Sequence, residues 1–268
     1  MLTAEQIDAA ARLLVSTRHE NAMVEAIPEN CRPQSLEDAY AIQDRMADLL
    51  EWRTGGWFCA CTNREIQSML GLAEPYYARL FADYILDSPA RLDPDAFPPM
   101  VLECEFGFRL ARDLPSRDTP YSRDEVEDAI ATVHPTIEVV AGHLRNWPEQ
   151  DVYSVIADNG TDGALIVGAG TRAWRGHDLV HTEVTLEVNG RVERHGAGAN
   201  VLGDPMAAFV WLANARSRAG GGLKAGDIHN TGTATPIYWV TPGDSAVAGF
   251  GSLGEVSLVI SSDAPPRT

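Results

Sequence analysis

The strongest structural signal in this sequence is the run Leu102-Glu103-Cys104-Glu105-Phe106-Gly107-Phe108-Arg109-Leu110. Side chains alternate between the two faces of a β-strand, so one face of this run is entirely apolar and should point into a core. The other face carries Glu103, Glu105 and Arg109, and Gly107 leaves room beside them. Neighbouring carboxylates repel each other unless water surrounds them or a cation lies between them. The run alone leaves both a solvent-facing strand and a cation site open.

A third acid favours the cation site. The segment Thr136-Ile137-Glu138-Val139-Val140 predicts an apolar strand with one acid in it. A buried glutamate without a partner is costly, whereas a bound metal ion would compensate its charge. No convincing histidine or thiolate ligand accompanies the three acids, so Glu103, Glu105 and Glu138 favour a hard cation, Mg²⁺ or Mn²⁺, over zinc.

Around these strands, the chain is predicted to be helical first and strand-rich afterwards. Helices are expected from a cap at Thr3, with Gln6 as its capping-box partner, and then over 35–51 and 63–70. From about residue 80, alternating runs separated by Pro, Gly and Asp predict strands over 100–110, 136–140, 163–167, 182–188, 237–240 and 256–260. Asn189-Gly190 predicts a hairpin, and further helices are expected over 123–133 and 205–219.

Composition narrows the class of protein. The chain has 268 residues, with 38 acidic against 21 basic side chains and a formal charge of −17, which disfavours nucleic acid as a partner. No apolar run approaches the length that a membrane span needs. Four cysteines and the lack of a signal-like apolar N-terminus indicate a cytoplasmic protein. Cys59 and Cys61 fit no zinc spacing and are expected to pack inside a strand.

Several motifs, in this order along the chain, resemble the 2-keto-4-pentenoate hydratase and 4-oxalocrotonate decarboxylase family of the fumarylacetoacetate hydrolase superfamily. The Glu-x-Glu strand and the segment around Glu138 look like its ligand set. The other matching segments are Asp38–Gln43, Gly56-Trp57 with Thr62, Leu80–Asp83, Ala157–Asn159 with Gly163, Gly203–Pro205 with Val210–Ala213, and Gly226–Ile228 with Thr231-Gly232.

The resemblance implies a fold, a site and a chemistry. It implies an α+β fold with a helical N-terminal portion, residues 1–75, followed by a fumarylacetoacetate-hydrolase-like mixed β-roll as catalytic domain, residues 76–268. Glu103, Glu105 and Glu138 would hold Mg²⁺ or Mn²⁺. The reaction would be hydration or decarboxylation of a small 2-oxo or 2-hydroxy-dienoic acid through a metal-stabilised enolate. Such enzymes usually form homo-oligomers, and some work in a complex with a pathway enzyme.

The chain departs from this family at one charged position. The family strand usually reads Gly-Trp/Tyr-Lys-Val-Gly, whereas here Phe58 stands where its lysine should be. Lys224, the only lysine in the chain, lies in a different matched segment. Removing an ammonium from the vicinity of a dianionic substrate would cost several kcal/mol at about 4 Å. We expect either that an arginine compensates or that the natural substrate is less anionic.

New polar groups stand where the family has few. His229 and Asn230 replace apolar residues, and Thr161-Asp162 replaces Ser-Cys or Ser-Ala, which suggests a repurposed rather than a decayed pocket. We consider His229 and Thr161, together with Asp83, which fits the family's acidic pocket position, as candidate catalytic residues, and Phe58, Asp158 and Thr231 as candidate substrate-binding residues. Each polar candidate also fits a structural role, such as a hydrogen-bonded strand-end histidine, a loop-tying acid or a turn threonine.

Three functions remain open from the sequence. The first is a metal-dependent lyase of the hydratase or decarboxylase type. The second is a repurposed superfamily enzyme, a tautomerase, cyclase or C–C hydrolase, acting on a less anionic substrate. The third is a metal-binding pseudoenzyme that supports an active partner. Phe58 favours the second and third, and the three retained glutamates count against the third.

Overall fold

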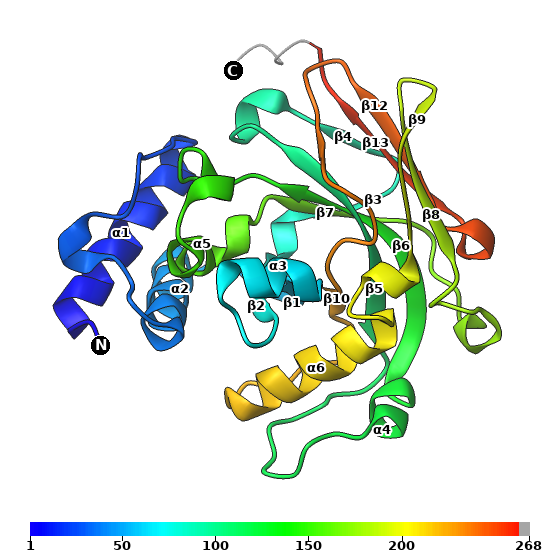
Figure 1. The fold of residues 1–268 in the computed structure, drawn as a ribbon, viewed down its shortest axis with the longest axis horizontal. Coiled ribbons are helices and arrows are strands. Elements are labelled where there is room, and N and C mark those ends of the chain that lie inside the picture. The colour runs from blue at the N-terminus through cyan, green and yellow to red at the C-terminus, as the bar shows by residue number, and fades with distance from the viewer. Residues whose placement is uncertain (263–268) are drawn as a thin grey trace.

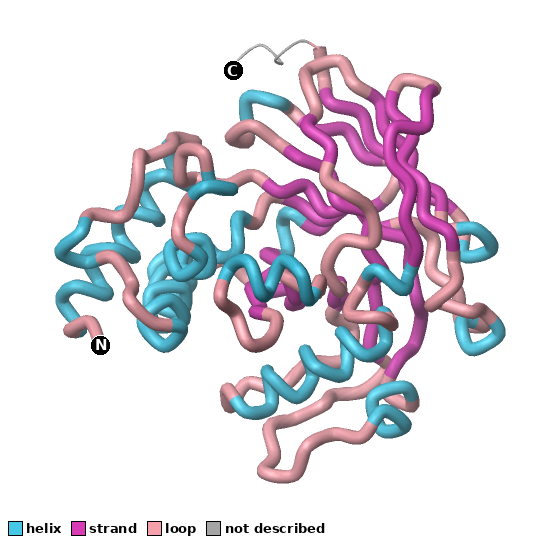
Figure 2. The backbone as a smooth tube through the Cα atoms, viewed as in Figure 1, coloured by secondary structure: helices cyan, strands magenta, loops and turns pink. Residues whose placement is uncertain are grey.

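A computed structural model describes residues 1–262, in which two helices come first and four more lie between the strands of two curled β-sheets (Figure 1). This α+β architecture confirms the fold class expected from the sequence. The helices lie mainly at one side of the molecule and at the lower edge of the sheets, as the helix and strand colours of Figure 2 show. They are α1 (Ala4–Glu20), α2 (Leu36–Leu50), α3 (Arg64–Leu70), α4 (Arg123–Glu127), α5 (Val152–Ala157) and α6 (Pro205–Arg218).

The N-terminal helices begin where the capping signals predict. The Thr3 side chain accepts a hydrogen bond from the Gln6 backbone, and the Gln6 side chain accepts one from the Thr3 backbone, so the predicted capping box is confirmed. The Ser35 side chain caps α2 by accepting a hydrogen bond from the backbone N–H of Asp38. Helices α1 and α2 pack their apolar faces into one cluster with α5, through residues such as Leu14 and Ile42.

The larger sheet has the strand order β2-β1-β10-β5-β6-β7-β3, and β11 also pairs with β5. Strand β5 pairs antiparallel with both β6 and β10, which places it at the middle of this sheet. Glu103 on β5 lies directly opposite Glu138 on β6. The bounds are β1 (Thr54–Ala60), β2 (Tyr76–Phe81), β3 (Ile85–Asp87), β5 (Val101–Leu110), β6 (Ile130–Val140), β7 (Ala164–Val167), β10 (Ile228–Asn230) and β11 (Tyr238–Trp239).

The second sheet covers part of the apolar face of β5. Its order is β4-β13-β12-β8-β9, with the predicted hairpin at Asn189-Gly190 joining β8 to β9. Phe106 of β5 meets Phe250 edge-on at 5.1 Å, and Phe108 stacks on Phe209 of α6 at 4.7 Å between ring centroids. The bounds are β4 (Ala90–Leu92), β8 (Glu183–Val188), β9 (Arg191–Ala197), β12 (Ser245–Gly249) and β13 (Glu255–Ile260).

One predicted helix ends earlier in the structure, and strands from both predicted parts of the chain share the larger sheet. The helix expected over 123–133 was wrong beyond Glu127, because residues from Ile130 onward pair with β5 and continue as β6. Strand pairing outweighed the helical spacing in a segment that contains β-branched residues. Strand β1, from the N-terminal portion, pairs with β10 inside the larger sheet, and the division near residue 75 stays a prediction. Residues 263–268 of the second part lie outside the described range.

No helix among residues 1–262 combines the length and the apolar character that crossing a bilayer requires. The four cysteines are free thiols.

Candidate metal centre

The three predicted acids converge on one point. Glu103, Glu105 and Glu138 each offer a carboxylate oxygen, and these oxygens lie within 4.8 Å of one another. Strand alternation explains the geometry, because Glu103 and Glu105 share one face of β5 and Glu138 faces Glu103 from β6. Glu105 and Glu138 are buried, and Glu103 is partly exposed. The apolar face of β5 packs on the opposite side, as the alternation predicted.

Neutral donors, and not side-chain cations, surround these carboxylates. The Asn230 side-chain Nδ2 donates to Glu105 Oε2 and to Glu138 Oε2, both at 2.6 Å. The backbone N–H of Gly232 donates to Glu105 Oε2 at 2.7 Å. Among the residues that the structure describes, no arginine, lysine or histidine forms an ion pair with any of the three acids.

Burial raises the pKa values of all three carboxyl groups in the cluster. Burial raises the pKa of Glu138 to about 8, and repulsion from Glu103 adds to the effect. Burial together with repulsion from Glu138 and Glu103 raises the pKa of Glu105 well above its usual range. Burial also raises the pKa of Glu103. Three like charges gathered out of water are unfavourable, and a bound dication would reverse the sign of that interaction.

This donor set fits a hard divalent cation. Carboxylate oxygens are the ligands that Mg²⁺ and Mn²⁺ prefer, and neither a thiolate nor an imidazole belongs to the cluster. Asn230 and the Gly232 N–H would act behind the ligands, since they orient carboxylates rather than occupy every oxygen. Gly232 has a φ of +86°, and a Cβ there would lie 2.2 Å from Thr62 Oγ1, so this close turn needs glycine.

Asn230 and Phe58 are neighbours across two strands. They lie directly opposite each other in the parallel pairing of β1 with β10. Phe58 lines the pocket beside the three acids, so the aromatic ring stands at the cluster where the resemblance expects a lysine. Asn230 supplies hydrogen-bond donors at the cluster from the adjacent strand. At this pair of positions, β10 contributes the polar side chain of Asn230 and β1 contributes the apolar ring of Phe58.

A cavity of about 280 Å³ opens onto the carboxylates. Its walls come from β1, β2, α3, α5 and the turns that follow β10 and precede β7. Most of its lining side chains are apolar or neutral, including Phe58, Tyr76, Val140 and Ile237. A concave, largely apolar cavity with convergent polar groups is the usual form of a small-molecule site.

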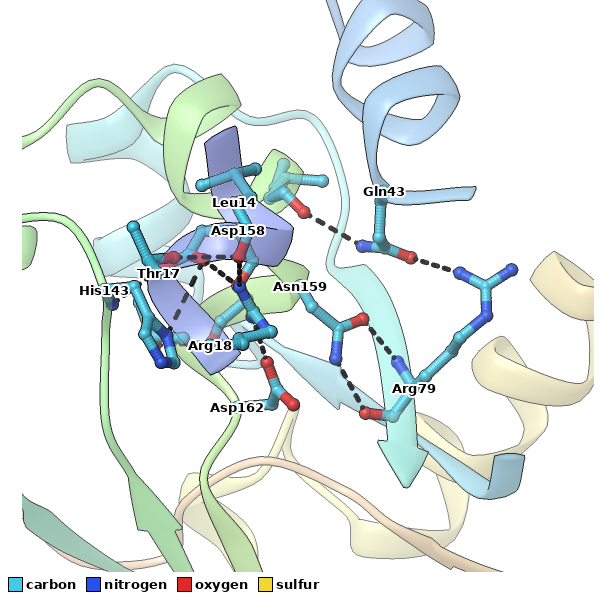
Figure 3. A network of polar contacts seen from close by, with 12 residues as sticks. Leu14, Thr17, Arg18, Gln43, Arg79, His143, Asp158, Asn159 and Asp162 are labelled. Carbon is cyan, nitrogen blue, oxygen red and sulfur yellow. Dashed lines mark hydrogen bonds and ion pairs between the residues drawn. The ribbon is translucent and has the colours of Figure 1, made fainter. Parts of the chain in front are cut away.

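One wall of this cavity is a strained turn held from behind. Asn159, Gly160 and Thr161 have φ values of 52°, 66° and 65°, so three consecutive residues are left-handed. Arg18 of α1 bonds to Asp158 Oδ1 and Asp162 Oδ1, both at 2.6 Å, and it also donates to the Asp158 carbonyl (Figure 3). The Asn159 side chain bonds both backbone groups of Arg79. The turn thereby presents Gly160 and Thr161 to the cavity.

The structure brings some predicted site residues together and separates others. Phe58 and Thr161 line the same cavity as the three glutamates. Asp158 is fully buried behind that cavity in its ion pair with Arg18. Asp83 lies on a separate cavity with Trp52 and Tyr84.

His229 and Thr231 are turned away from the carboxylates. His229 alternates with Asn230 along β10 and stacks on Phe209 of α6 at 5.7 Å. Its Nδ1 accepts a hydrogen bond from the Trp57 backbone, and burial lowers the pKa of His229 to about 3. Thr231 is buried and donates to the Phe106 carbonyl. Neither residue lines the cavity.

Some residues at the site were not selected from the sequence. Tyr76, Cys61 and Thr233 line the cavity, and burial raises the pKa of Cys61 to about 12. Burial also raises the pKa of Tyr76 well above its usual range, so its hydroxyl stays protonated. The alternation in Tyr76–Phe81 would have predicted strand β2, but not which face of it meets the acids.

The family model and the similar proteins found by sequence comparison point to the same family. Residues 89–260 match the family model described as fumarylacetoacetate (FAA) hydrolase, C-terminal. The chain is 30% identical over 258 residues to a 2-keto-4-pentenoate hydratase of Paraburkholderia xenovorans (strain LB400), covering 95% of each chain. It is 27% identical over 259 residues to a 4-oxalocrotonate decarboxylase of Pseudomonas putida, covering 96% of this chain and 97% of that one.

Solved structures agree with this result. The 4-oxalocrotonate decarboxylase from Pseudomonas putida G7, complexed with magnesium and adipate, superposes with a TM-score of 0.89 at 26% identity. The superposition covers 97% of this chain and 99% of that one.

Proposed function

This chain belongs to the fumarylacetoacetate hydrolase family, in the branch of its 2-keto-4-pentenoate hydratase and 4-oxalocrotonate decarboxylase relatives, and from that premise we propose that it is a divalent-metal-dependent lyase. The reaction proposed is hydration or decarboxylation of a small oxo or enol acid. The observation that carries this proposal is the convergence of Glu103, Glu105 and Glu138 at the floor of an apolar cavity.

In this proposal the three glutamates hold Mg²⁺ or Mn²⁺. Held there, such an ion would act as a Lewis acid that polarises the oxo or enol oxygens of a substrate. The Asn230 amide and the Gly232 N–H fix the orientation of Glu105, which keeps its second oxygen directed at the site. Because these two donors belong to a packed strand and to the backbone, the carboxylates are held in place before a cation binds.

The remaining cavity residues would bind the substrate. We assign the protonated Tyr76 hydroxyl as a hydrogen-bond donor to a substrate oxygen, and Thr161 Oγ1, which donates to the Gly160 carbonyl, as an acceptor. Phe58 and Val140 exclude water, which strengthens every polar contact inside the cavity. We do not assign His229 or Asp83 a part in the reaction, since both lie off this cavity.

One observation favours a second candidate function. Phe58 places an apolar ring beside the acids where the family resemblance expects an ammonium, so a dianionic enolate would lack a counter-charge. A tautomerase, cyclase or C–C hydrolase acting on a less anionic substrate would keep the metal site and tolerate this exchange.

The experiment that tests the lyase is a direct assay. The purified protein, incubated with Mg²⁺ and 2-hydroxypenta-2,4-dienoate, is expected to remove the dienol absorbance, and Glu105→Gln is expected to abolish this change. A wild-type protein that binds Mn²⁺ but leaves the dienoate untouched would contradict the hydratase; if it also releases no CO₂ from 4-oxalocrotonate, the lyase is contradicted and the second candidate is favoured.

A single variant separates the two candidates further. Phe58→Lys would return to β1 the ammonium that the family resemblance expects, and it leaves the hydrogen bonds from Asn230 to Glu105 and Glu138 in place. Increased dienoate turnover relative to wild type is expected if the rest of the pocket suits a dienoate. No increase, with Mn²⁺ binding intact, would indicate a pocket adapted to another substrate.

A further inference from the structure

The charge of the cavity restricts the ligand that can enter it. Among the described residues that line the cavity, the only charged side chains are Glu103, Glu105 and Glu138. The polar remainder is neutral, as in Thr62, Asn63, Gln150, Thr161 and Thr233.

Arg79, Arg216 and Arg109 have partners outside the cavity. Arg79 bonds to Gln43 and Asp44 and lies over the Trp57 ring, on the face of β1 opposite Phe58. Arg216 lies over the same Trp57 ring at 3.5 Å. Arg109 donates to the Gly226 carbonyl at the far end of β5. None of the three lines the cavity.

The far wall of the cavity is apolar and partly open to solvent. Helix α3 contributes Ile66, Met69 and Leu70, and the α5 side contributes Val152 and Val155. Met69 is 76% exposed although it lines the cavity, so it lies at the rim. A ligand that reaches from the acids to this wall would place its distal end against methyl and methylene groups.

We propose that the natural ligand is an oxo or enol compound that carries no more than one ionised group and ends in an apolar tail of several carbons. The inference rests on the proposed metal-dependent function and specifies its substrate class. Three carboxylates and one dication leave a formal charge of about −1, and a second ligand carboxylate would add to that negative charge beside apolar side chains, with no cation in the described lining to pair with it. A dicarboxylate is therefore disfavoured at the distal end, and a tail of the same length without charge is favoured.

A matched pair of ligands tests this selection. The full-length protein, loaded with Mn²⁺, is titrated calorimetrically with 2-oxoheptanoate and with 2-oxoadipate, which share the head group and differ in the distal end. We expect 2-oxoheptanoate to bind at least about tenfold more tightly, because the distal carboxylate of 2-oxoadipate would meet a net negative cavity whose described lining holds no cation. Benzoylacetone, a neutral chelator with a bulky apolar tail, is expected to bind as well.

A variant at the rim provides the converse test. Met69→Arg places a cation at an exposed lining position, and Met69→Gln is the neutral control of similar size. We expect Met69→Arg to improve 2-oxoadipate binding by about threefold, a surface-charge effect, and Met69→Gln to leave it unchanged.

The outcomes are distinct. Equal or tighter binding of 2-oxoadipate by the wild-type protein overturns the proposed substrate class, and so does failure of 2-oxoheptanoate to bind the Mn²⁺-loaded protein. Failure to bind Mn²⁺ in a titration without organic ligand overturns the proposed function itself, and the substrate class with it.

Discussion

Replacing Glu138 by glutamine should stabilise the metal-free protein at alkaline pH. Burial and repulsion from Glu103 raise the pKa of Glu138 from an ordinary value of 4.5 to about 8. Between those values the folded carboxyl keeps its proton while the unfolded one has lost it, so the unfolded state binds fewer protons. The free energy of unfolding therefore falls as the pH rises through this window.

The magnitude follows from the shift. At about 1.36 kcal/mol per pKa unit, the wild-type protein should lose about 4 kcal/mol of stability between pH 5 and pH 8 through this one group. Glu138→Gln has no such proton to lose, and its Oε1 can still accept from Asn230 Nδ2. The variant should thus match the wild type near pH 5 and exceed it by several kcal/mol at pH 8.

Urea unfolding in EDTA at pH 5 and pH 8 measures this difference, with the exposed Glu255→Gln as control. Adding Mn²⁺ at pH 8 should reverse the order, because a bound cation stabilises only the protein that keeps its ligands. A Glu138→Gln variant less stable than the wild type at pH 8 in EDTA would refute the reasoning, since it would mean that native contacts favour the charged form of Glu138.

Two further predictions concern residues that hold the three glutamates and the cavity turn in position. Asn230→Leu removes the two hydrogen bonds that Nδ2 donates to Glu105 and Glu138. The variant should bind Mn²⁺ about tenfold more weakly in a calorimetric titration. Unchanged affinity would argue against a role of Asn230 in orienting the ligands. Arg18→Met leaves Asp158 and Asp162 buried without their cation, which should cost about 3–5 kcal/mol in urea unfolding. Arg18→Met/Asp158→Asn should recover part of that loss, and a cost below about 1 kcal/mol for Arg18→Met would show that the turn does not depend on this ion pair.

The strand around Glu105 shows what local pattern can establish. Alternation alone separated the apolar face of β5 from the face with Glu103 and Glu105, and the isolated Glu138 in an apolar strand indicated a buried acid with a compensating partner. These are properties of neighbouring residues on one strand. They carry over to the folded chain because one face of each strand must be buried.

The positions of other residues depend on contacts between distant segments. The order of motifs could not tell that Asn230 faces the acids while His229 faces α6, because that requires the register of β10 against β5. The pairing of Arg18 with Asp158 joins residues 140 positions apart. The helix expected to reach Val133 ended early because pairing with β5 decides the local structure there.

Titration of the wild-type protein with Mn²⁺, followed by electron paramagnetic resonance, tests most directly whether three acids from two strands bind one dication. One equivalent of Mn²⁺ per chain should lose its free-ion signal, and Glu103→Gln, Glu105→Gln and Glu138→Gln should each weaken binding by at least about tenfold. Wild-type protein that leaves the free Mn²⁺ signal unchanged, or variants that bind as tightly as wild type, would contradict the metal site on which the proposed activity depends.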